Sequence, residues 1–150
     1  MGGILSLFQD FDVANFLPEP NAYLIMLAWS VRLGILIVPL VLLGLGAWYY
    51  FFPPKEANHA VGFRSYWAMG SVQAWQYAQR LAGVSYLGLG GVLFVISAVV
   101  CVFVNGQRAM GMINVALVCG LIQLVLVLAI WITLNVLIYQ AYDKDGNPKK

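Results

Sequence analysis

Charged side chains are scarce in this sequence. Of its 150 residues, 9% are Asp, Glu, Lys or Arg, whereas 62% are hydrophobic. A water-soluble domain carries about 25% charged residues, so this chain has too little polar surface to cover a globule in water. The net charge is only +2 and no basic cluster stands out, which argues against a nucleic-acid partner. We therefore expect a chain that lipid surrounds along most of its length.

Cysteine and histidine are also rare. The two cysteines, Cys101 and Cys119, lie inside apolar runs, where a free cysteine usually packs as a small apolar side chain. Their spacing predicts neither a zinc site nor a disulfide framework, so we expect no metal and no cofactor. The apolar runs also lack Asp and Glu, the residues that carry protons inside membranes, which argues against a proton-coupled drug pump.

Long apolar runs dominate what remains. A helix needs about 20 mostly apolar residues to cross a bilayer, and three runs qualify: 24–52, 84–104 and 112–139. Pro53-Pro54 ends the first, because proline cannot continue a helix and constrains the residue before it. Asn105-Gly106 is typical of a turn. The sequence predicts a single all-α integral membrane domain over residues 1–150 with three transmembrane helices.

The basic residues predict how the helices cross the membrane. Lys and Arg favour the cytoplasmic side. Residues 1–20, an outer interfacial segment in which 4–17 are predicted to form a short helix, contain none, and the turn after the second run contains only Arg108. The segment 53–82 and the tail 140–150 contain Lys55, Arg64, Arg80, Lys144, Lys149 and Lys150. We expect an inner-membrane protein with its N-terminus outside and its C-terminus in the cytoplasm.

Three features of the runs concern contacts between the helices. Arg32 either snorkels to the outer interface or faces a cavity between helices. Pro39 should bend the first helix. Small residues allow helices to approach closely in lipid, and they predict a seam between the second and third helices, with Gln123 either seeking a partner across it or lining a polar solute path. The seam residues are Gly83, Gly90, Ser97, Cys101, Ala116, Gly120 and Gln123.

The segment 58–83 is the polar exception in the chain. Gly62 and the aromatic residues after it predict a turn at the lipid headgroups, and Ser71 is a typical N-cap for a helix that begins at Val72. We expect a short interfacial helix that turns, or runs on, at Gly83. Its polar stripe is Gln73, Gln76, Tyr77 and Arg80, and its apolar stripe is Val72, Trp75, Gln79 and Ala82. The segment is either an interfacial anchor or an anion pocket formed by Arg64 and Arg80 with Asn58, His59 and Gln76.

The spacing of these polar residues resembles the motif of the SdpI/YfhL family. Asn58, Gly62-Phe63-Arg64-Ser65, Ser71, Trp75 and Arg80-Leu81-Ala82-Gly83 stand at the matching positions, just before a transmembrane helix. The resemblance implies an immunity protein that protects a bacterial membrane from a membrane-active killing peptide. It also implies signalling through a cytoplasmic regulatory protein. The implied binding residues are Asn58, Gly62, Arg64, Ser65, Trp75 and Arg80, with Asn58 and Ser65 fixing the loop, Gly62 permitting its turn and Trp75 seating the helix.

Two other functions stay open. The seams of small residues suit an accessory subunit of a membrane assembly, or a homo-oligomer. An enzyme acting on lipid headgroups would use His59 as a base and the arginines as a phosphate clamp. The loop 53–82 contains only one carboxylate, Glu56, and no activated nucleophile pair. We therefore expect a protein that is not an enzyme and whose partners are lipids and a peptide or protein.

Overall fold

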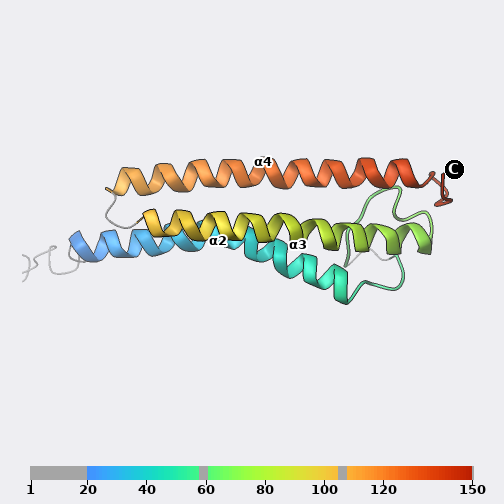
Figure 1. The fold of residues 1–150 in the computed structure, drawn as a ribbon, viewed down its shortest axis with the longest axis horizontal. Coiled ribbons are helices and arrows are strands. Elements are labelled where there is room, and N and C mark those ends of the chain that lie inside the picture. Colours follow the sequence, from blue (N-terminus) through green and yellow to red (C-terminus); the bar gives the residue numbers. More distant parts are fainter. Residues whose placement is uncertain (1–19, 58–60, 105–107, 150) are drawn as a thin grey trace, which may run out of the picture.

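Three long helices make up the part of the fold that the structure describes. The computed structural model describes residues 20–57, 61–104 and 108–149, and within them lie α2 (Pro20–Phe51), α3 (Val72–Phe103) and α4 (Ala109–Ala141). All three run side by side along the long axis and alternate in direction, so that the C-terminus lies at the end where α2 connects to α3 (Figure 1). Each is long and apolar enough to cross a membrane, which confirms the predicted all-helical class.

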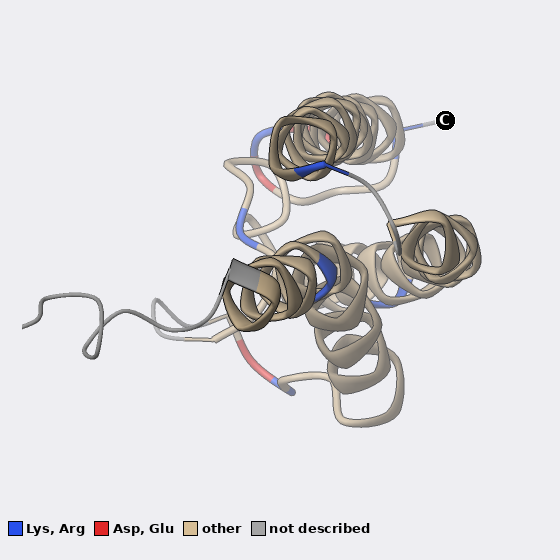
Figure 2. Cartoon of the chain, turned by 90° about the vertical axis from the view of Figure 1, so that its left-hand side faces the viewer, with Lys and Arg blue, Asp and Glu red and all other residues tan. Residues whose placement is uncertain are grey.

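Charge is almost absent from the helices. Arg32 is the only charged residue of α2, Arg80 is the only one of α3, and α4 has none. Figure 2 shows the same distribution, with the helices tan along most of their length and the charged residues mainly in the connections. The outer faces of these helices therefore suit a lipid environment.

The ends of the helices differ from the predicted ends in one place. α2 ends at Phe51, just before Pro53-Pro54, as expected. α3 begins at Val72, where the interfacial helix was expected to begin, and it continues through Gly83 without a break. Of the two predicted courses at Gly83, a turn or a continuation, the structure shows the continuation, and the interfacial helix is not a separate element. The glycine serves packing: a Cβ at Gly83 would lie 2.8 Å from the backbone nitrogen of Tyr50. The predicted outer helix of residues 4–17 lies outside the described residues.

Glycines bring α2 and α3 into backbone contact. A Cβ at Gly46 would lie 2.7 Å from the backbone nitrogen of Leu87, and one at Gly90 would lie 3.0 Å from that of Leu43. Gly83 and Gly90 thus form a seam as predicted, but with α2 and not with α4. The prediction for Gly120 is wrong, because nothing lies within 4 Å of its would-be Cβ.

α4 is instead held by side-chain clusters. One buried cluster joins it to α2 and to the end of α3 through Ala28, Val31, Ile35, Val104 and Met112, with Cys119 packed against it. A second cluster lies at the opposite end of α4, around Leu134 and Ile138. Contacts through side chains keep the α4 backbone at a greater distance than the glycine seam allows, which explains why Gly120 needs no close partner.

A single side chain, Gln123, links all three helices. Pro39 lies inside α2 and is buried, and because it has no N–H, it leaves the carbonyl of Ile35 without its helical partner. Gln123 on α4 donates from Nε2 to that carbonyl at 2.9 Å and to Ser97 Oγ on α3 at 3.1 Å. The prediction that Gln123 finds a partner across the seam is confirmed. Figure 1 shows the second half of α2 at an angle to the first, as expected for a helix with an internal proline.

Arg32 is directed toward a neighbouring helix. Its Nε donates to the carbonyl of Cys101 at 3.3 Å, and its guanidinium lies 5.0 Å from the centre of the Trp29 ring. Cys101 belongs to the last turn of α3, where carbonyls lack intrahelical partners and the helix dipole favours a cation. These contacts direct Arg32 toward the end of α3, and the choice between snorkelling and a cavity between helices stays a prediction.

The link through Gln123 can be tested with a double-mutant cycle. We expect Gln123→Leu to lower the free energy of unfolding in detergent by about 1–2 kcal/mol, because the Ile35 carbonyl loses its donor. In a Pro39→Ala background the new backbone N–H pairs with that carbonyl, so the same substitution should cost clearly less. Denaturant titration of the four proteins gives the coupling energy. An equal loss in both backgrounds would show that the proline is not the reason for the contact.

Candidate functional site

The described residues of the motif lie at one end of the bundle. The connection from Pro53 to Ser71, the first turns of α3 and the tail 142–149 lie together there (Figure 1). We call this region the motif end. Asn58 and His59 belong to it by sequence but lie outside the described residues. The other five predicted site residues are all described.

Gln79 fixes the loop around Phe63, which we call the motif loop, to α3. The backbone N–H of Phe63 donates to Gln79 Oε1 at 2.8 Å, and Gln79 Nε2 donates to the carbonyl of Phe63 at 2.9 Å. Gln79 is fully buried, so its amide takes the place of a neighbouring strand and satisfies both polar groups of one residue. The sequence contained the signal, because Gln79 interrupts the apolar stripe of the helix, but its role was not predicted.

Gly62, Ser65 and Trp75 shape the same loop. Gly62 has φ +117°, which only glycine adopts readily, and a Cβ there would lie 2.8 Å from the Trp75 ring. Ser65 Oγ accepts a hydrogen bond from the backbone N–H of Ala68 at 3.1 Å. Trp75 is fully buried and its Nε1 donates to the carbonyl of Pro54 at 2.8 Å. These three residues position the loop, and Trp75 presents no surface to a partner.

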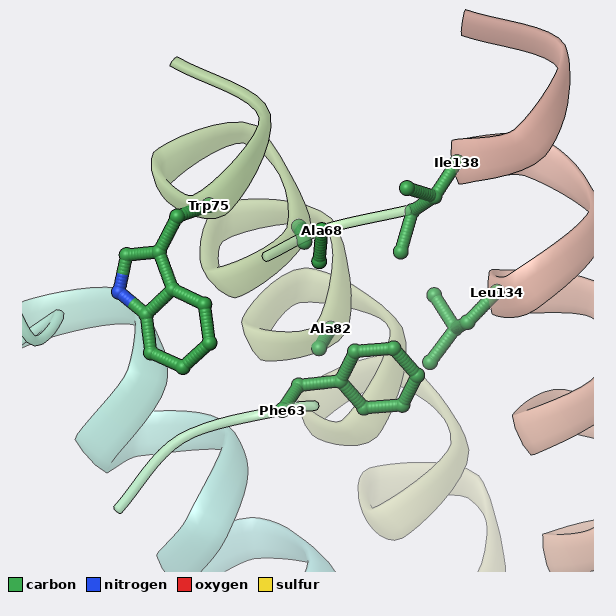
Figure 3. Packing of buried hydrophobic residues seen from close by; sticks show 7 residues of the cluster. Phe63, Ala68, Trp75, Ala82, Leu134 and Ile138 are labelled. Atoms are coloured by element: carbon green, nitrogen blue, oxygen red, sulfur yellow. The ribbon is translucent and has the colours of Figure 1, made fainter. Parts of the chain in front are cut away.

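The loop is part of the hydrophobic core. Figure 3 shows the Phe63 ring between α3 and α4, with Ala82 on one side and Leu134 on the other. Ala68 occupies the equivalent space nearer to Ile138. Phe63 is 5% exposed, so its ring packs in the core and not against lipid, and the level of this turn in the membrane stays a prediction. Burial of Phe63 fixes the direction in which the next residue, Arg64, leaves the core.

The C-terminal tail docks on the N-cap of α3. Ser71 Oγ accepts from the backbone N–H of Ala74 at 3.1 Å, which confirms the predicted cap, and it also donates to the carbonyl of Gly146 at 2.7 Å. Lys149 lies over the rings of Tyr139, at 3.8 Å, and Trp67, at 5.5 Å. The sequence indicated only a polar tail. The structure makes it a wall of the motif end.

A turn closed by Asp143 shapes this tail. Its Oδ1 accepts from the backbone N–H groups of Asn147, at 2.8 Å, and Asp145, at 3.0 Å. These bonds hold the pKa of the Asp143 carboxyl below its ordinary value, the bond from Asn147 having the largest effect. The charged form of Asp143 therefore favours the docked tail.

Arg64 and Arg80 line two different hollows. Arg80 lines a groove of about 550 Å³, which we call the Arg80 groove. Arg64 lines a hollow of about 380 Å³, the Arg64 hollow, together with Leu45, Trp48, Tyr49, Val61 and Gly62. Of the two alternatives for this segment, the single pocket for both arginines is not what the described residues form. Gln79 faces the loop, and the next residue of a helix points about 100° away, so Arg80 leaves the loop side.

The motif end offers hydrogen-bond donors and cations. Within the described ranges, no three residues among His, Cys, Asp and Glu lie close enough to hold a metal ion. Both arginines are exposed, and amide and phenol groups accompany Arg80. Such groups bind anions by charge-assisted hydrogen bonds.

The Gln79 contact predicts how the loop responds to substitution. We expect Gln79→Leu to raise the hydrogen-exchange rate of the Phe63 amide about 30-fold, because two buried backbone groups lose partners worth about 2 kcal/mol. Gln76→Leu, one turn earlier and exposed, is the matched control and should leave the rate unchanged. Unaltered protection of Phe63 in Gln79→Leu would contradict the assigned contact.

Asp143 makes docking of the tail dependent on pH. Its docked-state pKa lies below 3.8, the ordinary value, so its contribution is complete above about pH 4 and is lost as the pH falls through the docked-state pKa. We expect the amide chemical shifts of Gly146 and Asn147 to move to undocked values in this acidic range. Asp143→Asn should remove that transition, and an identical acid transition in the variant would assign it to another group.

The comparisons with known proteins agree with the motif. Residues 55–139, more than half of the chain, match the model of the SdpI/YfhL protein family. No curated protein and no solved structure matches. The matched region starts just after Pro54 and ends near the close of α4, so it contains the loop, Gln79, both arginines and the Gln123 contact with Ser97. The chain is a multi-pass membrane protein that belongs to the SdpI/YfhL family.

Proposed function

We propose that this chain is a non-enzymatic immunity protein that protects its membrane from a membrane-active peptide. The Arg64 hollow is the proposed binding site for the peptide. The observation that carries the proposal is the combination, in one hollow, of a guanidinium with exposed apolar side chains of a membrane-spanning helix. Such a surface matches a peptide that has both apolar side chains and a carboxylate.

The surroundings of Arg64 support this proposal. Leu45 and Trp48 on α2 are 41% and 54% exposed, so they offer an apolar contact at the lipid-facing side of the hollow. Arg64 follows Phe63, whose backbone is held at both polar groups by Gln79. A loop that is fixed before binding loses little conformational entropy when a ligand arrives. Tryptophan and arginine are also the residues that most often carry binding energy at interfaces.

We place the motif end on the cytoplasmic side. The two segments with most Lys and Arg are the connection from α2 to α3 and the tail, and both lie at this end of the bundle (Figure 1). The short connection from α3 to α4 contributes only Arg108, so the distribution fits the preference of basic residues for the cytoplasm. In this orientation the hollow meets the part of an inserted peptide that reaches the inner leaflet. A cytoplasmic regulatory protein would reach the same end, which is how we account for a signalling role.

A protection assay tests the function. We expect cells that express the wild-type chain to survive a membrane-active peptide that kills control cells. Arg64→Ala should lower the highest peptide concentration that the cells survive about tenfold or more, because charge-assisted hydrogen bonds contribute about 1.5–3 kcal/mol. Tyr66→Ala, at a residue that is 73% exposed and outside the hollow, is the matched control and should protect normally.

Membrane abundance of each variant is measured in parallel by immunoblot. Full protection by Arg64→Ala at normal abundance would remove the hollow from the proposal. If cells with the wild-type chain survive a broad panel of peptides no better than control cells do, the result would count against immunity itself.

A further inference from the structure

We propose that the Arg80 groove binds a phosphate group carried by an anionic lipid headgroup. Three parts of the chain build the groove: the segment after α2, one face of the first turns of α3, and the residue that follows α4. The groove is separate from the Arg64 hollow, so this proposal does not depend on the proposed immunity function. Its lining residues are Pro53, Pro54, Lys55, Gln73, Gln76, Tyr77, Arg80 and Tyr142.

The lining is chemically suited to phosphate. Lys55 and Arg80 supply two cations, and the described lining contains no Asp or Glu that would neutralise them. A guanidinium binds phosphate through two parallel N–H bonds, whereas an ammonium acts as a point charge. Around these cations, the side-chain amides of the glutamines and the phenol groups of Tyr77 and Tyr142 add neutral donors. A cationic ligand would find no counter-charge in this lining.

The groove is rigid before any ligand binds. The carbonyl of Pro54 accepts a hydrogen bond from the buried Trp75 indole, which holds the wall that carries Lys55. The rings of Tyr77 and Tyr142 lie 5.4 Å apart between centres, which joins the α3 wall to the tail. Ser71 fixes the tail through Gly146. Preorganised walls reduce the entropic cost of binding.

The position of the groove favours a lipid headgroup over a soluble phosphate. It begins directly after α2, whose last residues Trp48 and Phe51 are exposed, as is Phe52. Exposed aromatic residues at the end of a membrane span mark the interface level, which is where the phosphates of a bilayer lie. The volume of about 550 Å³ also exceeds what an inorganic phosphate needs and falls in the range of sites for larger ligands.

A specific site differs from general attraction of basic residues to an anionic membrane. General attraction depends on charge alone and amounts to about 1 kcal/mol for each Lys or Arg. A built site depends on the fork of the arginine as well. Arg80→Lys keeps the charge and removes the fork, and it therefore distinguishes the two.

The test measures lipid binding by the full chain in neutral detergent. Native mass spectrometry counts bound phosphatidylglycerol at increasing lipid concentration, with phosphatidylcholine as the neutral reference. We expect wild type to bind phosphatidylglycerol with preference, and Arg80→Ala and Arg80→Lys to bind it about tenfold more weakly or worse. Gln76→Glu, which places a carboxylate in the groove, should have a similar effect.

Matched controls come from the other arginines. Arg108→Ala, at the opposite end of the bundle, and Arg64→Ala, in the other hollow, should bind phosphatidylglycerol as wild type does. Binding that is unchanged in Arg80→Ala would overturn the proposal. Wild-type binding by Arg80→Lys would overturn the built site and leave general attraction.

Two soluble competitors identify the source of the phosphate. Inorganic phosphate and glycerol 3-phosphate are added separately to the wild-type complex with phosphatidylglycerol, each at the concentration of the lipid. If the groove serves a lipid headgroup, neither should displace the lipid at equal concentration. Displacement by glycerol 3-phosphate would overturn the assignment to lipid and indicate a soluble phosphate ester instead.

Discussion

The need to pair backbone polar groups away from water governs this structure. In lipid, a free carbonyl or N–H has no solvent partner, and leaving it unpaired costs several kcal/mol. Helices solve the problem for most residues, but Pro39 and the motif loop reopen it. Gln123 pairs the carbonyl that Pro39 leaves free, and Gln79 pairs both groups of Phe63. The arrangement of the chain follows from where these side chains can reach.

This constraint separates two kinds of polar residue. A buried glutamine such as Gln79 or Gln123 donates to backbone of another segment, and Gln123 also donates to Ser97 Oγ, so its function is structural. Arg64 and Arg80 are exposed arginines, each next in sequence to a residue of the Phe63–Gln79 contact, and the charge of each lies at a hollow. The hydrogen bonds of Gln79 therefore set the direction in which the two arginine side chains leave the core. Function at the motif end therefore rests on contacts that no ligand touches.

The sequence predicted the features that depend on local chemistry. Run lengths predicted three spanning helices, Pro53-Pro54 predicted the end of α2, and Ser71 was correctly identified as an N-cap. What it could not predict depends on which helices meet. Glycine at 83 was compatible with a turn or with close packing, and only the proximity of Tyr50 decides between them.

Polar residues in apolar stripes posed the same difficulty. Gln79 was visible as an irregularity, but its partner, Phe63, lies 16 residues away across a loop, and spacing along the chain does not indicate which backbone groups a loop leaves unpaired. A shared pocket for Arg64 and Arg80 was one of two alternatives, because both are basic and were expected on the same side of the membrane. Their separation results from the direction in which the Gln79 contact holds the loop.

The two hollows nevertheless share one stretch of chain. Lys55 belongs to the groove, Val61 and Gly62 belong to the Arg64 hollow, and all three lie in the connection that Trp75 and Gln79 hold. A substitution of Trp75 or Gln79, which we call the clamps, should therefore disturb both hollows. A substitution of one arginine should disturb only the hollow that this arginine lines. Loss of lipid binding and of protection together identifies damage to the clamps, and loss of one alone identifies a binding residue. This difference allows positioning residues to be told from contact residues even though all of them lie within one motif.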